Sequence, residues 1–312
     1  MKLHDLVLFK TQLIKSLSVA DSVEHLTRLR NQIAGLITAL PNLTEDQQEY
    51  VQALVEHYET VITKTEQPVT ELTNYIKTID AQIEEIVHQL FVGNYELEEQ
   101  YGNVEHVRAM RKIKVNDDIS DVVRQRINLL SNWRYPTLEI GCRDGEWTQF
   151  LVAADPLYII DRQQEFLDST NSRFPESYQR RLRKYPLVDH NLSILPANQF
   201  GFIFSWGYFN YVSMDTMKQY LKQAFNLLRP GGTFMFTYND GDTPAGSGMA
   251  ENHAQSYMPK SYLTALCESL GYKIAAEYDF HPYVSWIDIQ KPGELETNKA
   301  HQVMGEIKRI TL

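Results

Sequence analysis

The chain has 312 residues, of which 43% are hydrophobic and 22% charged, a balance typical of a globular protein. Its net charge of −10 argues against a general nucleic-acid binder, which usually carries a basic face. No apolar run is long enough to predict a membrane-spanning helix, and Met1 to Asp5 do not open a secretory signal. With only two cysteines, Cys142 and Cys267, we expect no disulfide framework and a cytoplasmic location.

The first 95 residues are patterned as helices. Apolar residues recur there at spacings of three and four, most regularly at Leu72, Ile76, Ile79, Ile83, Ile86 and Leu90. A seam of this period places one apolar stripe against a partner helix, as in a coiled coil. Pro41 ends one helix, Thr44 and Gln47 form a capping box, and Pro68 permits a new start. We therefore expect at least three helices of about 15 to 22 residues, arranged as a hairpin or small bundle.

Two interpretations of this helical region remain open. Residues 1–95 are either a domain for oligomerisation or docking, or an ordinary helical domain that packs on its own chain. The first interpretation predicts a homo-oligomer or a larger assembly. Residues 96–117 are charged and mixed and are expected to form a linker, and residues 296–312 a C-terminal tail.

From residue 118 to residue 295 the pattern changes to strands that alternate with helices. Strands are predicted at 137–141, 157–160, 182–188, 200–205, 233–238, 272–278 and 283–290. Helices are predicted at 118–131, 145–153, 162–172, 213–228 and 260–270. This alternation indicates an α/β domain with seven mostly parallel strands and helices on both faces of the sheet. Ligands of such sheets bind beyond the carboxyl ends of the strands.

The sharpest motif follows the first strand and reads Glu139-Ile-Gly-Cys-Arg-Asp-Gly145. Its two glycines allow a ligand to lie against the backbone. A dinucleotide fingerprint would need further glycines, where the chain has Arg143 and Glu146. Asp161 closes the second strand, where a carboxylate can accept two hydrogen bonds from ribose hydroxyls. The motif therefore favours a ribose-bearing ligand over a dinucleotide.

These residues resemble the class I S-adenosylmethionine-dependent methyltransferases, whose first motif is an acidic residue followed by alternate glycines. Glu139, Gly141 and Gly145 match that motif, and Arg143 stands in place of the middle glycine. Residues 227–232 also match the turn before the family's fifth strand. The resemblance covers about residues 118–290 and implies a Rossmann-like fold.

The resemblance implies S-adenosylmethionine as the cofactor and assigns residues to it. The implied contacts are Glu139, Gly141, Arg143, Gly145, Asp161, Arg162, Asp189, Asn191, Ser205 and Trp206. Asp161 would hold the ribose with Arg162 beside it, and Asp189 or Asn191 would meet the adenine. Arg143 would either crowd the methionine moiety or pair with its carboxylate.

The methyl acceptor is narrowed by the motifs that the chain lacks. Ser205-Trp-Gly-Tyr208 contains neither of the two prolines found in enzymes that methylate exocyclic amines of nucleic-acid bases, and no Pro-Cys nucleophile is present. The acceptor is therefore expected to be a small molecule or a protein side chain. Candidate catalytic groups are His253, Tyr208 and Asp240. His253 stands in a polar segment, residues 239–258, that is predicted to be a loop and lid. No metal site and no membrane or nucleic-acid partner is expected.

A different class of function also suits the sequence. A methyltransferase-like fold with a helical arm can serve as a non-catalytic structural or assembly protein. Residues 284–293 resemble methyltransferase-like proteins encoded by tailed bacteriophages. This resemblance implies a virion location and docking through the N-terminal helices.

Overall fold

The computed structural model describes residues 3–16, 27–28, 30–32, 34–35, 45–90, 117–281 and 284–295. The chain divides into two compact units, Met1–His88 and Gln89–Leu312. Residues 96–116 of the predicted linker and the predicted tail lie outside the described residues. None of the helices in the described ranges is both long and apolar enough to cross a membrane.

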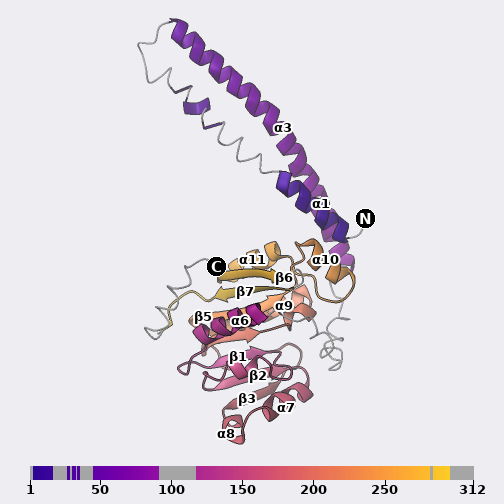
Figure 1. Cartoon of the computed structure of the whole chain (residues 1–312), viewed down its shortest axis with the longest axis vertical. Coiled ribbons are helices and arrows are strands. Elements are labelled where there is room, and N and C mark those ends of the chain that lie inside the picture. The colour runs from indigo at the N-terminus through magenta and orange to yellow at the C-terminus, as the bar shows by residue number, and fades with distance from the viewer. Residues whose placement is uncertain are drawn as a thin grey trace. The chain divides into compact units, whose positions relative to one another are not determined.

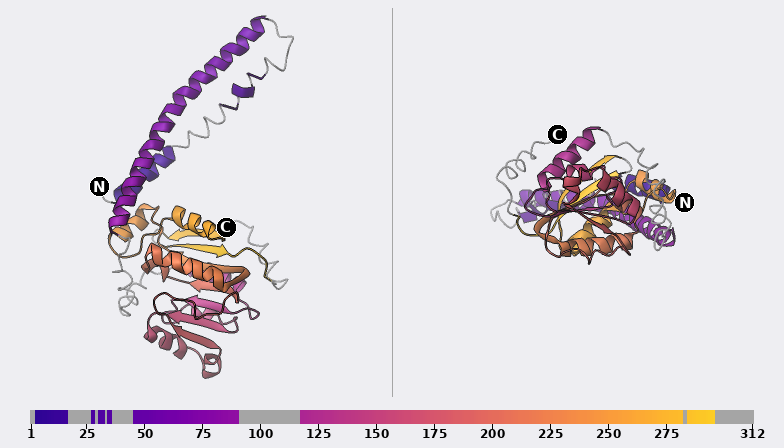
Figure 2. Two further views of the ribbon diagram at one scale, coloured as in Figure 1. Left: turned by 180° about the vertical axis from the view of Figure 1, so that it is seen from behind. Right: turned by 90° about the horizontal axis from the view of Figure 1, so that it is seen from below.

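The first unit is built around helix α3 (Glu45–Leu90), with helix α1 (Leu3–Ser16) running along the C-terminal half of α3 (Figures 1 and 2). An ion pair joins the two helices, because Lys10 Nζ lies 2.7 Å from a carboxylate oxygen of Asp80. A second pair, at 3.8 Å, connects Arg30 to Glu59 of α3. The predicted hairpin or small bundle stays a prediction, because most of residues 17–44, including the predicted helix end at Pro41, lies outside the described residues.

Helix α3 is continuous over 46 residues, so the prediction of a helix break at Pro68 was wrong. Its less exposed side chains keep the heptad spacing on both sides of the proline, at Tyr58, Ile62, Val69, Leu72, Ile76, Ile79, Ile83 and Ile86. A proline inside a helix costs about 3 kcal/mol. Burial of an aliphatic side chain contributes roughly 1.5–3 kcal/mol, and four such side chains on α3 are buried. The continuous apolar seam therefore outweighs the lost backbone hydrogen bond.

The second unit contains a seven-stranded sheet with the order β3-β2-β1-β4-β5-β7-β6 (Figure 1). The strands are β1 (Thr137–Ile140), β2 (Leu157–Asp161), β3 (Leu182–Pro186), β4 (Phe200–Ser205), β5 (Leu228–Tyr238), β6 (Lys273–His281) and β7 (Val284–Gln290). Strands β1 to β5 are parallel to one another, and β7 runs antiparallel to both β5 and β6. The prediction of a mostly parallel seven-stranded sheet is confirmed.

Six helices accompany the sheet among the described residues of this unit. They are α6 (Asp117–Leu130), α7 (Gln164–Ser172), α8 (Glu176–Gln179), α9 (Met214–Leu227), α10 (Pro244–Glu251) and α11 (Lys260–Ser269). Helix α9 begins at the predicted cap, where the Ser213 hydroxyl accepts a hydrogen bond from the Thr216 amide. Gly271, in the left-handed conformation at φ +90°, follows the end of α11 as predicted.

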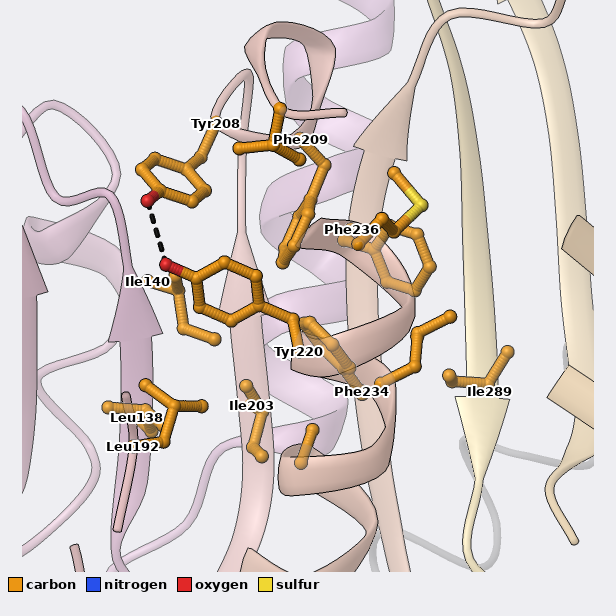
Figure 3. Packing of buried hydrophobic residues seen from close by; sticks show 14 of the residues in the cluster. Leu138, Ile140, Leu192, Ile203, Tyr208, Phe209, Tyr220, Phe234, Phe236 and Ile289 are labelled. Atoms are coloured by element: carbon orange, nitrogen blue, oxygen red, sulfur yellow. Dashed lines mark hydrogen bonds between the residues drawn. The ribbon is translucent and has the colours of Figure 1, made fainter. Parts of the chain in front are cut away.

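Helices cover both faces of the sheet, and strand residues alternate between two apolar clusters. Ile203 and Phe236 face one cluster together with residues of α9 and α11. Phe204 and Met235 face the other cluster together with residues of α6. Figure 3 shows the first cluster, in which Tyr220 lies among residues of the central strands. This alternation determines which side chains of each strand face which layer of helices.

The helix predicted over residues 145–153 was wrong, because only a short 3₁₀ helix (Thr148–Phe150) forms there. Gly145 adopts φ +76°, which begins the segment outside helical geometry. Thr148 is fully buried, and its hydroxyl donates a 2.6 Å hydrogen bond to Glu139 inside the sheet. The ring of Trp147 packs near Phe204 of β4. Contacts with the sheet, rather than a helical backbone, therefore determine the path of this segment.

A buried ion pair connects α6 to β7, between Arg126 and the fully buried Asp288. Asp288 also accepts a hydrogen bond from the indole of Trp286.

We predict that Arg126→Met lowers the free energy of unfolding by about 3–5 kcal/mol, because it leaves a buried carboxylate without its counter-charge. Urea denaturation measures the change. The matched control is Arg124→Met on the same helix, whose ion pair with Asp121 is exposed and contributes about 1 kcal/mol or less. Equal losses in the two variants would contradict this prediction.

Candidate cofactor site

The sheet order reverses between β1 and β4, which makes the crevice at their carboxyl ends a topological switch point. Strands β2 and β3 extend the sheet on one side of β1, and β4 and β5 extend it on the other. Gly141 directly follows β1, Asp161 ends β2 and Ser205 ends β4. These three predicted site residues therefore lie at one edge of the sheet, where ligands of open α/β sheets bind.

The turn after β1 has an unusual backbone conformation. Gly141, Arg143 and Gly145 have φ angles of +75°, +50° and +76°. Glycine adopts this left-handed region freely, whereas a residue with a side chain is strained in it. The amide of Gly145 closes the turn with a 2.9 Å hydrogen bond to the carbonyl of Cys142. The two glycines of the motif are thus required by backbone geometry, and Arg143 must be held in place by other contacts.

Asp161 supplies one of those contacts. Its carboxylate is fully buried, and one oxygen accepts a 3.0 Å hydrogen bond from the amide of Arg143. The other oxygen accepts a 3.0 Å hydrogen bond from the amide of Gln163, just before α7. The carboxylate therefore joins the turn after β1 to the turn after β2. Arg162, between them, is half-buried. The assignment of Asp161 and Arg162 to a ribose stays a prediction.

The side chain of Arg143 crosses from the turn after β1 to the segment after β4. Its Nη2 donates a 2.6 Å hydrogen bond to the carbonyl oxygen of Gly207. The guanidinium carbon also lies 5.9 Å from the centre of the Tyr211 ring. The hydroxyl of Thr170 on α7 donates to the carbonyl of Arg143 at 2.7 Å. The arginine thus connects the turn after β1 to the segment after β4, which form the two walls of the switch point.

The segment after β4 is fixed to its neighbours by buried polar contacts. The Ser205 hydroxyl donates a 2.8 Å hydrogen bond to the carbonyl of Ile140. Trp206 is largely buried, and its ring centre lies 4.9 Å from that of Trp147. The amide of Gly207 donates a 2.6 Å hydrogen bond to the hydroxyl of Thr237 on β5. Ser205 and Trp206 therefore belong to the wall of the crevice that faces the turn of β1.

A buried amide network behind this wall was not predicted from the sequence. The Thr237 hydroxyl donates to the side-chain oxygen of Asn210, and the Asn210 amide donates to the side-chain oxygen of Gln255. Asn239 donates to the carbonyls of Gly246 and Ser256. The predicted loop over residues 239–258 was wrong, because helix α10 forms within it, and the role of this segment as a lid stays a prediction. Several of its side chains are buried.

Glu139 lies on the same face of β1 as α6 and is almost completely buried. Burial raises the pKa of its carboxyl group to about 8, and the hydrogen bond from Thr148 opposes this shift only in part. Glu139 is therefore mainly protonated at neutral pH. A neutral carboxyl group here is a structural partner of the segment after β1.

The residues predicted to meet adenine lie in an exposed loop after β3. Asp189 and His190 both have positive φ angles, of 49° and 55°. The side-chain oxygen of Asn191 accepts a 2.8 Å hydrogen bond from the amide of Ser193. Gln223 of α9 holds the loop from both sides, by donating to the carbonyl of His190 and accepting from the amide of Leu192. The loop is thus anchored to α9, and its role toward adenine stays a prediction.

The three predicted catalytic residues lie on different elements. The hydroxyl of Tyr208 is fully buried and bonds to the hydroxyl of Tyr220 at 2.8 Å (Figure 3). Asp240 accepts hydrogen bonds from the amides of Asp242 and Lys260, so it caps α11, and burial raises its pKa. It also lines a surface hollow of about 510 Å³ beside α11 and β6. His253 follows the end of α10. A catalytic base among these residues stays a prediction.

Within the part of the chain that the structure describes, no group of three or more histidine, cysteine, aspartate or glutamate residues is arranged to hold a metal ion.

Comparison with protein families gives one match over this region. Residues 138–234 match the family described as the methyltransferase domain. The matched residues run from β1 into β5 and include the turn of Gly141, Asp161 and the segment after β4. The match supports a methyltransferase domain with S-adenosylmethionine as its cofactor. A comparison with curated proteins gave no match.

Solved structures of S-adenosylmethionine-dependent methyltransferases are similar to the second unit. One from Methanosarcina mazei is 14% identical, with a TM-score of 0.45 over 54% of this chain and 97% of that chain. One from Aquifex aeolicus is 14% identical, with a TM-score of 0.44 over 59% and 97%. Geranyl diphosphate C-methyltransferase from Streptomyces coelicolor is 8% identical, with a TM-score of 0.48 over 56% and 81%. Likenesses of this size do not carry the activity of those proteins over to this chain. The resemblance of residues 284–293 to phage proteins is not tested by these comparisons.

The raised pKa of Glu139 predicts a pH-dependent stability. The unfolded carboxyl group has a pKa of 4.5 and the folded one about 8, so the folded state binds the additional proton between these values. This contribution is present in full below pH 4.5 and is lost as the pH rises to about 8. Glu139→Gln removes the ionisation. We predict that wild-type stability falls relative to the variant across this window, by up to about 1.4 kcal/mol per pH unit. Urea denaturation at several pH values measures it, and a constant difference would contradict the assignment.

Proposed function

We propose that this chain is an S-adenosylmethionine-dependent methyltransferase that acts on a small molecule or a protein side chain. The observation that carries the proposal is the family match over residues 138–234, which includes the glycine turn and Asp161 at the switch point. The acceptor classes follow from the missing nucleic-acid motifs in Ser205–Tyr208.

The groups at the crevice are chemically suited to this cofactor. Asp161 offers carboxylate oxygens for ribose hydroxyls, and Gly141 and Gly145 leave backbone uncovered by side chains of their own. Arg143 offers a guanidinium that matches a carboxylate. In the observed conformation the backbone amide of Arg143 donates to Asp161, and its guanidinium donates to the carbonyl of Gly207. These groups therefore fit S-adenosylmethionine, provided that contacts with the cofactor replace some of the contacts within the protein.

When bound, S-adenosylmethionine supplies a methyl group on a sulfonium, which is already a good leaving group. The chain's own contribution is therefore alignment and exclusion of water rather than strong acid–base chemistry. Trp206, held against Trp147, and the buried network of Thr237 and Asn210 give one wall of the crevice a fixed shape. A base is needed only for an acceptor that must lose its proton.

For the first unit we propose a role in self-association or docking. The support is the heptad seam of α3, together with three large apolar side chains of α1 that remain 41–50% exposed, namely Leu8, Phe9 and Ile14. Sedimentation velocity of the whole chain tests this role. We predict an oligomer that Phe9→Glu with Ile14→Glu shifts to the monomer. A wild-type monomer at tens of micromolar protein would contradict self-association, and exposed Lys77→Glu is the matched control.

The cofactor is tested by isothermal titration of the whole protein with S-adenosylhomocysteine. We predict binding in the micromolar range, about −8 kcal/mol. Asp161→Asn should weaken it at least tenfold, because the amide loses the charge that attracts ribose hydroxyls. The matched control is Asp168→Asn on the exposed face of α7, and thermal melting reports whether either variant is less stable. No binding by the folded wild type, or equal binding by Asp161→Asn, would contradict the proposal.

A further inference from the structure

Arg143 adds a charged contact between the two walls of the switch point, which the Ser205–Ile140 hydrogen bond and the Trp206–Trp147 ring contact also join. Arg143 replaces the middle glycine of the motif, and its guanidinium donates a 2.6 Å hydrogen bond to the carbonyl of Gly207 across the crevice. Because the donor is charged, this bond is stronger than one between neutral groups. The ring of Tyr211 lies on the same side, 5.9 Å from the guanidinium carbon. The arginine is only half-buried, so its side chain has solvent on one side.

The surfaces that Arg143 draws together are in close contact. A Cβ atom at Gly207 would lie 2.7 Å from Nη2 of Arg143, and one at Gly141 would lie 2.7 Å from the Cβ of Tyr208. The ring of Tyr208 therefore lies directly on the turn after β1. Its hydroxyl is bonded to that of Tyr220 (Figure 3). The Tyr220 hydroxyl is also 3.0 Å from Nδ1 of His190. The position of the Tyr208 ring over Gly141 is thus fixed by its hydrogen bond to Tyr220.

The carboxylate of Asp161 also takes part in contacts within the protein. Both oxygens of Asp161 accept backbone hydrogen bonds, one of them from Arg143, and the side chain is fully buried. Because the carboxylate is fully buried, a ribose could reach it only after neighbouring residues had moved. Arg143 therefore contacts the carboxylate through its backbone amide and the segment after β4 through its guanidinium.

We infer that Arg143 is a latch that holds the cofactor crevice closed, and that opening requires its guanidinium to leave the carbonyl of Gly207. The inference rests on the proposed function for the identity of the ligand, but the latch is a property of the protein itself. A site that is open for only a fraction of the time binds with an affinity reduced by that fraction. Arg143 therefore weakens cofactor binding, in contrast to an arginine that anchors the ligand's carboxylate.

The variant that tests the latch is Arg143→Gly. At φ +50° glycine is less strained than arginine, so we expect the variant to fold. Arg143→Asn is the second variant, since asparagine tolerates this conformation and removes the guanidinium. The control is Arg180→Ala, which removes an exposed arginine from the end of α8. Titration with S-adenosylhomocysteine should show at least tenfold tighter binding for both Arg143 variants and no change for the control. Equal or weaker binding would overturn the latch.

Amide hydrogen exchange of the ligand-free whole protein gives a readout that does not depend on the cofactor. The latch predicts at least tenfold faster exchange in residues 207–211 of Arg143→Gly, with β1 and β4 unchanged. Unchanged exchange in that segment would overturn the latch. If exchange accelerates but neither wild type nor variant binds S-adenosylhomocysteine, the latch is supported and the proposed cofactor is wrong.

Discussion

The buried carboxylate of Asp161 is the constraint on which the candidate site depends. It accepts one backbone hydrogen bond from the turn after β1 and one from the turn after β2. A buried amide without a partner is costly, so the carboxylate fixes Arg143 in its left-handed conformation. That conformation in turn directs the arginine side chain across the crevice to Gly207. One carboxylate thereby holds the backbone of two turns and the amide from which the Arg143 side chain extends.

The opposite wall is fixed by a different kind of contact. Thr237 accepts from the amide of Gly207 and donates to Asn210, which is itself bonded to Gln255. Buried networks of this kind hold one arrangement when every member has a partner. The segment after β4 is therefore tied to β5 and to the segment that contains α10. Arg143 adds a charged bond between these two walls, and it is the contact that we infer must open before the cofactor binds.

Much of the α/β unit could be predicted from the sequence, because local patterns determine it. The bounds of β4 agree with the prediction, as does the cap of α9 at Ser213. The errors come from long-range contacts. Thr148 and Trp147 pack against the sheet instead of forming a helix, and the apolar seam of α3 continues through Pro68. Neither effect is visible in a local pattern of turn or helix signals.

In the candidate site, too, the features set by local pattern could be predicted and those set by long-range contacts could not. Gly141, Asp161 and Ser205 were expected at one edge because each follows or ends a predicted parallel strand, and they lie there. The direction of the Arg143 side chain and the bond between Tyr208 and Tyr220 depend on segments more than ten residues apart. The sequence left two alternatives for Arg143, crowding or pairing with a carboxylate, and both stay predictions.

The most direct test of this account is a crystal structure of the whole chain with S-adenosylhomocysteine. The account predicts that the nucleoside lies at the carboxyl ends of β1 and β4, with its ribose against Asp161 and with Arg143 no longer bonded to Gly207. A ligand bound elsewhere would contradict the assignment of the site. A ligand bound in the crevice with the bond from Arg143 to Gly207 intact would contradict the latch.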